Sequence, residues 1–156
     1  MPPDFQILQS LQRHGVPFVV VGGHAVNFHG YRRATEDIDV VWLRSAEGEE
    51  ALFKALSEIN ARYIGTDIDP ATGIERMFPV TLPWIKATRL MMLYTDHGFL
   101  DLFDYIPGFP SEDPAALLLK SPEVDGIRFV TLDWLRRMKR AAGRPRDLLD
   151  LENLPE

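Results

Sequence analysis

The chain has 156 residues, of which 46% are hydrophobic and 26% are charged, and it contains no cysteine. These proportions are typical of a soluble globular domain, and the lack of cysteine excludes disulfide bridges and cysteine-ligated zinc. With 17 basic and 23 acidic residues the net charge is −6, which argues against binding of a nucleic-acid backbone over the whole surface.

Helices and strands are predicted to alternate over the first 60 residues, because apolar residues recur at helical spacing in some segments and form short β-branched runs in others. Phe18 to Val21 is such a run, and Gly22-Gly23 ends it. Ser45 can cap a longer helix with one apolar side. The predicted order is helix, strand, helix, strand, helix, at 5–14, 18–21, 24–29, 38–43 and 45–60.

The pattern weakens between Arg62 and Pro83, where glycines and prolines interrupt it, so we predict a loop with a short strand near 77–82. Two extended runs follow, joined by Asp96-His97-Gly98, and they predict a β-hairpin. A Pro-rich connection then leads to the C-terminal part of the chain. The remaining predicted elements are hairpin strands at 89–95 and 99–104, a short helix at 115–119, an edge strand at 127–130, and helices at 132–142 and 145–154.

Basic residues concentrate in the segment from Arg128 to Arg146. This segment holds seven arginines and lysines and one acidic residue, so its net charge is +6 while the rest of the chain is acidic. On the predicted helix, Arg136, Lys139 and Arg140 are expected to share a polar face. Two interpretations remain open: contact with phosphates, which we favour, and an ordinary solvated helix face.

A glycine pair and two aspartates form the central motif of the sequence. Gly22-Gly23 stands where a strand turns into a helix, so backbone N–H groups and the helix dipole can face an anion such as phosphate. Thirteen residues later, Asp37 and Asp39 occupy positions i and i+2 of a strand and project from the same face. Two such carboxylates would repel each other without a cation, so the motif predicts Mg²⁺, or Mn²⁺ in its place.

Asp101 is the expected third carboxylate of the site. It interrupts the apolar run from Phe99 to Phe103, where a buried acid needs a cation or another partner. A third carboxylate would complete a two-metal centre, in which cations ~4 Å apart hold the attacking and leaving oxygens of a displacement. Asp37, Asp39 and Asp101 are therefore the candidate catalytic residues and metal ligands.

These features together resemble the nucleotidyltransferase superfamily, whose members have a DNA polymerase beta-like fold. The resemblance lies in Gly22-Gly23, in the spacing to Asp37-Ile38-Asp39, and in the acid Asp101 on a later strand. Finer features at 33–39 and 139–147 are similar to small bacterial nucleotidyltransferases related to abortive-infection toxins.

The resemblance implies an α/β fold with a mixed β-sheet flanked by helices. It covers 18–43, 88–104 and 131–154, and it leaves the middle of the chain and the Pro-rich connection unmatched. The implied organisation is a single domain at 1–156, with a catalytic core at about 16–106 and a basic, helical C-terminal segment at about 131–154.

The resemblance also implies roles for individual residues. Gly22 and Gly23 would hold the phosphates of a nucleoside triphosphate, and Asp101 would help to deprotonate the acceptor hydroxyl. Lys139 and Arg146 would balance the charge of the triphosphate.

Three residues near the glycine motif are further candidates for nucleotide contact: His24, Arg33 and Thr35. For two of them a structural role is an equal alternative. His24 could be an ordinary histidine at a helix start, and Thr35 an ordinary turn residue.

The predicted reaction is metal-dependent transfer of a nucleoside monophosphate from a triphosphate to an acceptor hydroxyl. An RNA end, a protein side chain and a small molecule all remain open as acceptors. The competing hypothesis is a non-catalytic nucleotide-binding module that acts through a cognate partner protein, as in a toxin–antitoxin pair. Three intact acids argue against it, because an unpaired carboxylate cluster would only destabilise a protein that no longer bound metal.

The sequence predicts no membrane segment. Its apolar runs are far shorter than the ~18 residues that span a bilayer, and the N-terminal residues lack the basic flank of a secretory signal. We therefore expect a cytoplasmic protein. A second copy of the chain could complete the substrate cleft in a homodimer.

Overall fold

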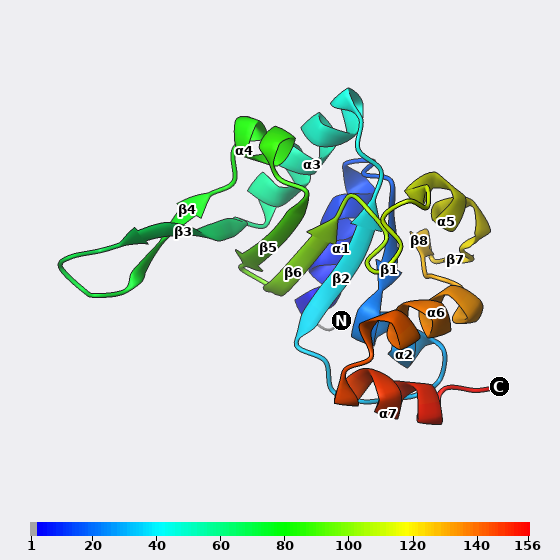
Figure 1. Cartoon of the computed structure of the whole chain (residues 1–156). Coiled ribbons are helices and arrows are strands. Elements are labelled where there is room, and N and C mark those ends of the chain that lie inside the picture. Colours follow the sequence, from blue (N-terminus) through cyan, green and yellow to red (C-terminus); the bar gives the residue numbers. More distant parts are fainter. Residues whose placement is uncertain (1–2) are drawn as a thin grey trace.

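The computed structural model describes residues 3–156, which form a mixed α/β fold (Figure 1). Six strands form one sheet flanked by helices, and two short strands form a separate hairpin. The helices are α1 (Pro3–Arg13), α2 (Gly22–Phe28), α3 (Ala46–Glu58), α4 (Leu82–Ala87), α5 (Pro114–Lys120), α6 (Leu132–Ala142) and α7 (Pro145–Asn153). The strands are β1 (Phe18–Val21), β2 (Asp37–Trp42), β3 (Arg62–Ile68), β4 (Glu75–Pro79), β5 (Leu90–Thr95), β6 (Gly98–Phe103), β7 (Glu123–Val124) and β8 (Ile127–Arg128). None of the described helices is long and apolar enough to cross a membrane.

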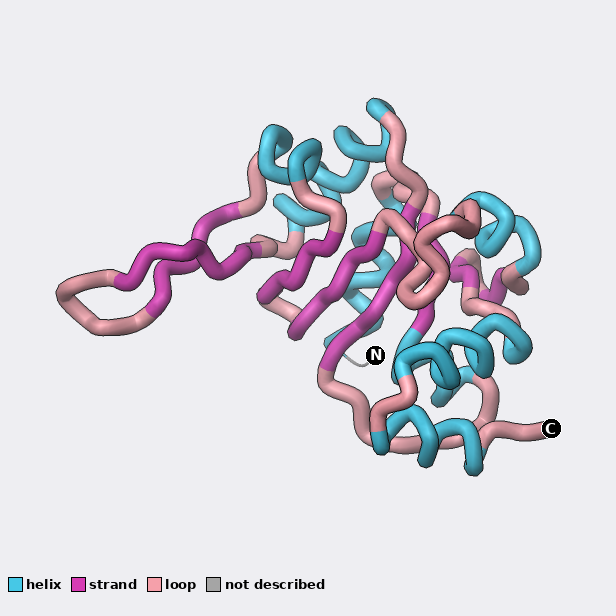
Figure 2. The backbone as a smooth tube through the Cα atoms, in the orientation of Figure 1, coloured by secondary structure: helices cyan, strands magenta, loops and turns pink. Residues whose placement is uncertain are grey.

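The large sheet has the strand order β1-β2-β6-β5-β3-β4. β2 and β6 run parallel, whereas the other neighbouring strands are antiparallel. A parallel pair needs a crossover connection, and α3, the β3–β4 hairpin, α4 and β5 lie in the chain between these two strands. Figure 2 shows the β3–β4 hairpin projecting beyond the rest of the sheet. The crossover therefore returns the chain to the middle of the sheet, beside β2.

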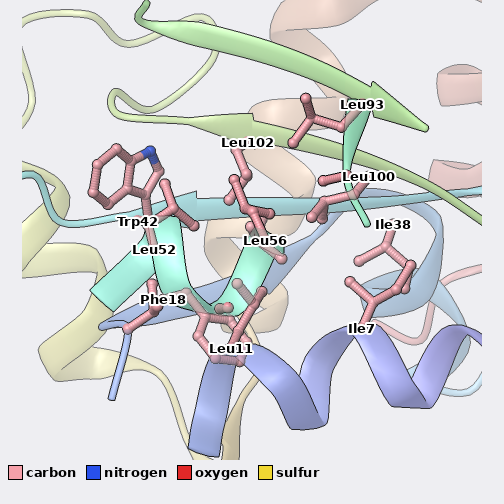
Figure 3. Packing of buried hydrophobic residues seen from close by; sticks show 14 of the residues in the cluster. Ile7, Leu11, Phe18, Ile38, Trp42, Leu52, Leu56, Leu93, Leu100 and Leu102 are labelled. Atoms are coloured by element: carbon pink, nitrogen blue, oxygen red, sulfur yellow. The ribbon is translucent and has the colours of Figure 1, made fainter. Parts of the chain in front are cut away.

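One face of the sheet packs against α1, α3 and α4. Alternate strand residues point to this face, and Ile38, Leu100 and Leu102 are at most 1% exposed. Ile7 of α1 and Leu56 of α3 pack onto them (Figure 3). This layer is the larger of the two hydrophobic clusters in the described part of the chain, and it underlies all of β1, β2, β5 and β6.

The opposite face of the sheet is covered only in part. Val21 of β1 and Val41 of β2 are buried there beneath side chains of α2, α5 and α6. On the same face of β5 and β6, Leu90, Met92 and Phe99 are 39%, 64% and 40% exposed. We call β1 and β2 with their two helical layers the closed half, and β6, β5, β3 and β4 the open half.

Most elements lie where the sequence predicts them. The ends of α6 agree to the residue, because the Thr131 hydroxyl accepts a hydrogen bond from the N–H of Trp134 and Gly143 takes the left-handed conformation with φ of 61°. Several elements differ from their predicted bounds by one or two residues. The helix predicted at 24–29 already begins at Gly22, and the edge strand predicted at 127–130 is the two-residue strand β8, which pairs with β7.

The prediction of a loop at 62–83 is wrong. These residues form the hairpin of β3 and β4 and the start of α4, and the short strand predicted near 77–82 corresponds in part to β4, which ends at Pro79. Most side chains of β3 and β4 are exposed, so the strands lack the alternation of apolar and polar residues by which a half-buried strand is found. The start of α4 did carry a signal, because the Thr81 side chain caps it by accepting the N–H of Trp84.

Candidate active site

Asp39 and Asp101 lie side by side in the middle of the sheet. The parallel register of β2 and β6 pairs these two residues directly, at the strand spacing of roughly 4.8 Å. Burial, reinforced by the charge of Asp101, raises the pKa of Asp39 to about 7, and burial also raises the pKa of Asp101. The nearby charge of Lys139 lowers the pKa of Asp39 but does not outweigh these effects.

Asp37 stands at the exposed start of β2 and pairs in register with Phe99. Among the residues that the structure describes, no three acidic or histidine side chains are grouped closely enough to hold a metal ion. The Asp39–Asp101 pair is thus formed, whereas the predicted three-carboxylate centre is not assembled. Oxygen-rich carboxylate pairs that repel each other are the donors that a hard divalent cation such as Mg²⁺ accepts, so the pair fits this cation.

The glycine motif makes room for side chains of the site. Gly22 begins α2 with φ of 67°, and a Cβ atom there would collide with Oδ2 of Asp39. A Cβ atom on Gly23 would collide with the hydroxyl group of Thr35. Sequence reasoning missed this packing role, because it depends on residues 12 to 17 positions away. The N–H groups of a first helical turn have no partner within the helix, so they can still face a ligand.

A cavity of about 490 Å³ connects the acids, the glycines and the C-terminal segment. We call it the site cavity. Nine of the ten predicted site residues line it: Gly22, Gly23, Arg33, Thr35, Asp37, Asp39, Asp101, Lys139 and Arg146. The tenth, His24, lies in α2 and is not among the lining residues.

Four lining residues were not predicted for the site: Ala34, Glu36, Phe103 and Arg144. Phe103 stands two residues after Asp101 on one strand, so the alternation of a strand places it on the same face and could have indicated it. Arg144 carries a weaker signal, since it belongs to the basic segment but lies beyond the end of α6.

Lys139 lies on the buried side of α6, not on a polar face shared with Arg136 and Arg140. Its side chain is 8% exposed, and Nζ lies 3.1 Å from Oδ1 of Asp147 and 2.9 Å from Oδ2 of Asp150. The prediction fails because Lys139 follows the buried Leu135 by one helical turn and so points in nearly the same direction. Arg140 is exposed, as expected for a solvated position.

Arg33 joins the same cluster from the loop between α2 and β2. Its Nε and Nη2 donate to the two carboxylate oxygens of Asp150 at 2.6 and 2.8 Å, which is a bidentate pair. Nε of Arg144 donates to Asp147 at 2.7 Å. The set Arg33, Asp150, Lys139, Asp147 and Arg144, which we call the ion-pair network, holds the loop, α6 and α7 around the site cavity. Three cations and two carboxylates leave it with one positive charge.

The two carboxylates of the network are ionised at neutral pH. Burial opposes their ionisation, but hydrogen bonds from Arg144 and Lys139 to Asp147, and from Arg33 and Lys139 to Asp150, outweigh it and lower both pKa values. Arg146 differs from these residues, because its exposed side chain lines the cavity without an ion-pair partner in the described residues. The lining of the site cavity thus combines four acidic residues, Glu36, Asp37, Asp39 and Asp101, with four basic ones, Arg33, Lys139, Arg144 and Arg146.

Comparison with solved structures shows the same fold in other proteins. TM1012 of Thermotoga maritima, named as a candidate nucleotidyltransferase, matches with a TM-score of 0.55 and 17% identity over 97% of this chain and 93% of that chain. ANT(2″)-Ia in complex with adenylyl-2″-tobramycin matches with a TM-score of 0.53 and 12% identity, over 96% and 83% of the two chains. JHP933 of Helicobacter pylori matches with a TM-score of 0.50 and 16% identity. The match covers 94% of this chain but only 62% of JHP933.

No family model and no curated protein matches the sequence. The structural likenesses, at identities of 12–17%, establish the fold and leave the function to be argued from the site. The six-stranded mixed sheet and the flanking helices agree with the expectation from the sequence. The described chain therefore has the nucleotidyltransferase fold.

Proposed function

We propose that this protein transfers a nucleoside monophosphate from a nucleoside triphosphate to a hydroxyl group of a small molecule. The observation that carries the proposal is the pairing of Asp39 with Asp101 in a cavity that is also lined by Arg33, Lys139 and Arg146. The carboxyl groups suit the reacting hydroxyl, and the cations suit phosphates.

The transfer forms one bond and breaks one. The acceptor hydroxyl oxygen attacks the α-phosphorus, and the bond from this phosphorus to the oxygen that bridges to the β-phosphorus breaks, so pyrophosphate leaves with the bonding electrons. The hydroxyl proton passes to a carboxylate oxygen of Asp101, which lines the site cavity beside Asp39. The products are the nucleotidylated acceptor and pyrophosphate.

The cations of the cavity would hold the triphosphate. Arg146 is free of ion pairs with described residues and can meet a phosphate directly, whereas Lys139 and Arg33 are fixed by Asp150 and present a preorganised charge. The N–H groups of Gly22 and Gly23, which line the same cavity, are further candidate donors.

Asp39 and Asp101 would hold a divalent cation, and Asp37, which lines the same cavity, would become a third ligand by moving toward them. When bound, Mg²⁺ or Mn²⁺ would supply positive charge beside the carboxyl pair and would neutralise charge on the phosphates. The raised pKa of Asp39 supports this assignment, because burial and the neighbouring Asp101 disfavour two negative charges at this place.

The small-molecule acceptor is favoured over RNA and over a protein side chain. A structural neighbour, ANT(2″)-Ia, is in complex with adenylyl-2″-tobramycin, a nucleotidylated small molecule. The net charge of −6 disfavours a polyanionic acceptor. A role in a toxin–antitoxin pair would require a protein or RNA acceptor or a cognate partner, and the assay below separates these outcomes.

Transfer is tested with each α-labelled nucleoside triphosphate, Mg²⁺ or Mn²⁺, and fractions of a cell extract as the source of acceptor. Asp101→Asn is expected to lower the transfer of label ~100-fold or more, because it removes the group that accepts the proton. This variant also removes a like charge beside Asp39, so it should fold. Asp69→Asn is the matched control, since Asp69 is only partly buried in the turn of the β3–β4 hairpin and does not line the site cavity.

Transfer that persists in Asp101→Asn would contradict the proposed site. Label in the RNA or protein fraction would contradict the small-molecule acceptor. Thermal stabilisation by a triphosphate and Mg²⁺ without any labelled product would instead favour a nucleotide-binding module that acts through a partner protein.

A further inference from the structure

The open half presents apolar side chains directly beside Asp101. Leu90, Met92 and Tyr94 alternate along β5 toward the face that lacks a helical layer, and the register of β5 and β6 pairs Met92 with Asp101. Paired residues of antiparallel neighbours project from the same face of the sheet, with Cβ atoms about 5 Å apart. Because Met92 is 64% exposed, an accessible apolar surface begins next to the acid.

A groove of about 650 Å³ continues this surface toward the β3–β4 hairpin. Tyr63, Phe78, Trp84 and Tyr94 belong to its walls, and we call it the aromatic groove. The rings of Tyr63 and Trp84 stack with centres 4.2 Å apart and planes at 5°, and Phe78 lies 5.8 Å from Tyr63. The groove therefore offers flat aromatic surfaces that are already held in position, and another ring can pack on such surfaces.

The aromatic groove and the site cavity differ in charge. Arg33, Lys139, Arg144 and Arg146 line the site cavity, whereas the described residues around the groove carry one charge, that of Asp67. A phosphate-rich polymer needs cations along its path, so the groove does not suit RNA. Its volume lies within the range of ~300–1,000 Å³ that is usual for small-molecule sites.

We propose that the aromatic groove binds the acceptor, and that the acceptor is a small molecule whose reacting hydroxyl stands next to a flat apolar ring. The ring packs on the stacked side chains, and the hydroxyl extends past Met92 to Asp101, one strand away. This inference rests on the proposed function, because Asp101 is taken to receive the proton of the acceptor. It adds the chemistry by which the acceptor is selected.

Two glycosides test the groove as matched probes. Phenyl β-D-glucopyranoside and methyl β-D-glucopyranoside carry the same sugar hydroxyls, and only the first has an aromatic ring. Their binding to the whole chain is measured by calorimetry without nucleotide, so the readout does not depend on catalysis. The phenyl glycoside is expected to bind about tenfold more tightly or better, because its ring packs in the groove.

Three variants locate the binding. Trp84→Ala removes one stacked ring, and Met92→Ser removes an exposed apolar side chain without opening the core. Each is expected to weaken binding of the phenyl glycoside about tenfold, toward that of the methyl glycoside. Leu119→Ser is the control, because Leu119 is 83% exposed on α5, away from the open half. If Trp84→Ala does not fold, the proposal is tested with Met92→Ser alone.

Equal affinities for the two glycosides, or an affinity unchanged in both groove variants, would overturn the proposal. If the wild type is a dimer and Met92→Ser is a monomer, this face binds a second copy of the chain. If Met92→Ser and the wild type label RNA equally well, the acceptor binds elsewhere. Either outcome would also overturn the proposal. Thermal stabilisation by triphosphate and Mg²⁺ is measured on the same preparations. If triphosphate and Mg²⁺ do not stabilise the wild type, the result counts against the proposed function. If they do stabilise it but the two glycosides bind equally well, the result counts against the aromatic groove alone.

Discussion

The closed and open halves of the sheet share one helical layer and differ in the other. In the closed half, α2, α5 and α6 bury residues such as Val21 and Val41, and α7 adds the ion-pair network at the edge of the site cavity. In the open half, the same face carries exposed apolar side chains beside Asp101. The difference suggests that the closed half holds the charged side chains in position, whereas the open half leaves an apolar surface on which a ligand can bind.

The largest expected effect breaks the ion-pair network of the closed half. Asp150→Asn leaves Arg33 without its bidentate partner and Lys139 with Asp147 alone. Removing one partner of a buried ion pair costs about 3–5 kcal/mol, so the free energy of unfolding in urea should fall by about this amount. Glu152→Gln, at an exposed position of α7, should change it by less than about 0.5 kcal/mol. Similar values for the two variants would show that the network adds nothing to the closed half.

Acidification should act on the same carboxylate. The pKa of Asp150 is lower in the folded chain than the value of about 3.9 for an unfolded chain. Its contribution is therefore complete above pH ~4 and is lost as the pH falls through the folded-state pKa. Wild type should consequently lose more stability below pH ~4 than Asp150→Asn does. Parallel curves of unfolding free energy against pH would contradict this expectation.

Two neighbouring methionines sharpen the comparison within the open half. Met91 is fully buried on the covered face of β5, and Met92 is 64% exposed on the uncovered face. Met91→Ala should lower the free energy of unfolding by about 2–5 kcal/mol, whereas Met92→Ala should change it by less than about 0.5 kcal/mol. If Met92→Ala were equally destabilising, the face described as open would have to be covered in solution.

Two glycines with positive φ separate backbone strain from damage to the site. An alanine at either position costs about 1–2 kcal/mol, because both adopt a left-handed conformation. At Gly143 the nearest atom to an added Cβ is the carbonyl oxygen of Arg140 at 3.6 Å, so strain is the whole effect. At Gly22 the added Cβ displaces Asp39. Gly22→Ala should therefore abolish transfer of label, while Gly143→Ala keeps it, and equal activities would refute the contact.

The sequence alone predicts the closed half better than the open half. The run from Phe18 to Val21 and the helix capped by Thr131 carry strong local signals, because burial and capping act on residues close together in the chain. β3 and β4 carry no such signal, since a projecting hairpin exposes both of its faces. Among the candidate site residues, the pairing of Asp39 with Asp101 follows from the motif. The inward direction of Lys139 follows from its helical spacing to Leu135, whereas its ion pairs with Asp147 and Asp150 depend on the placement of α7.

The parallel pairing of β2 and β6 makes the site a late product of folding. Asp39 and Asp101 are far apart in the chain, and β2 and β6 can pair only when the connection between them has folded. The β5–β6 hairpin, by contrast, needs only local contacts and can form early. A refolding chain should therefore regain hairpin structure before it regains binding of nucleotide, so recovery of that binding would report completion of the whole sheet.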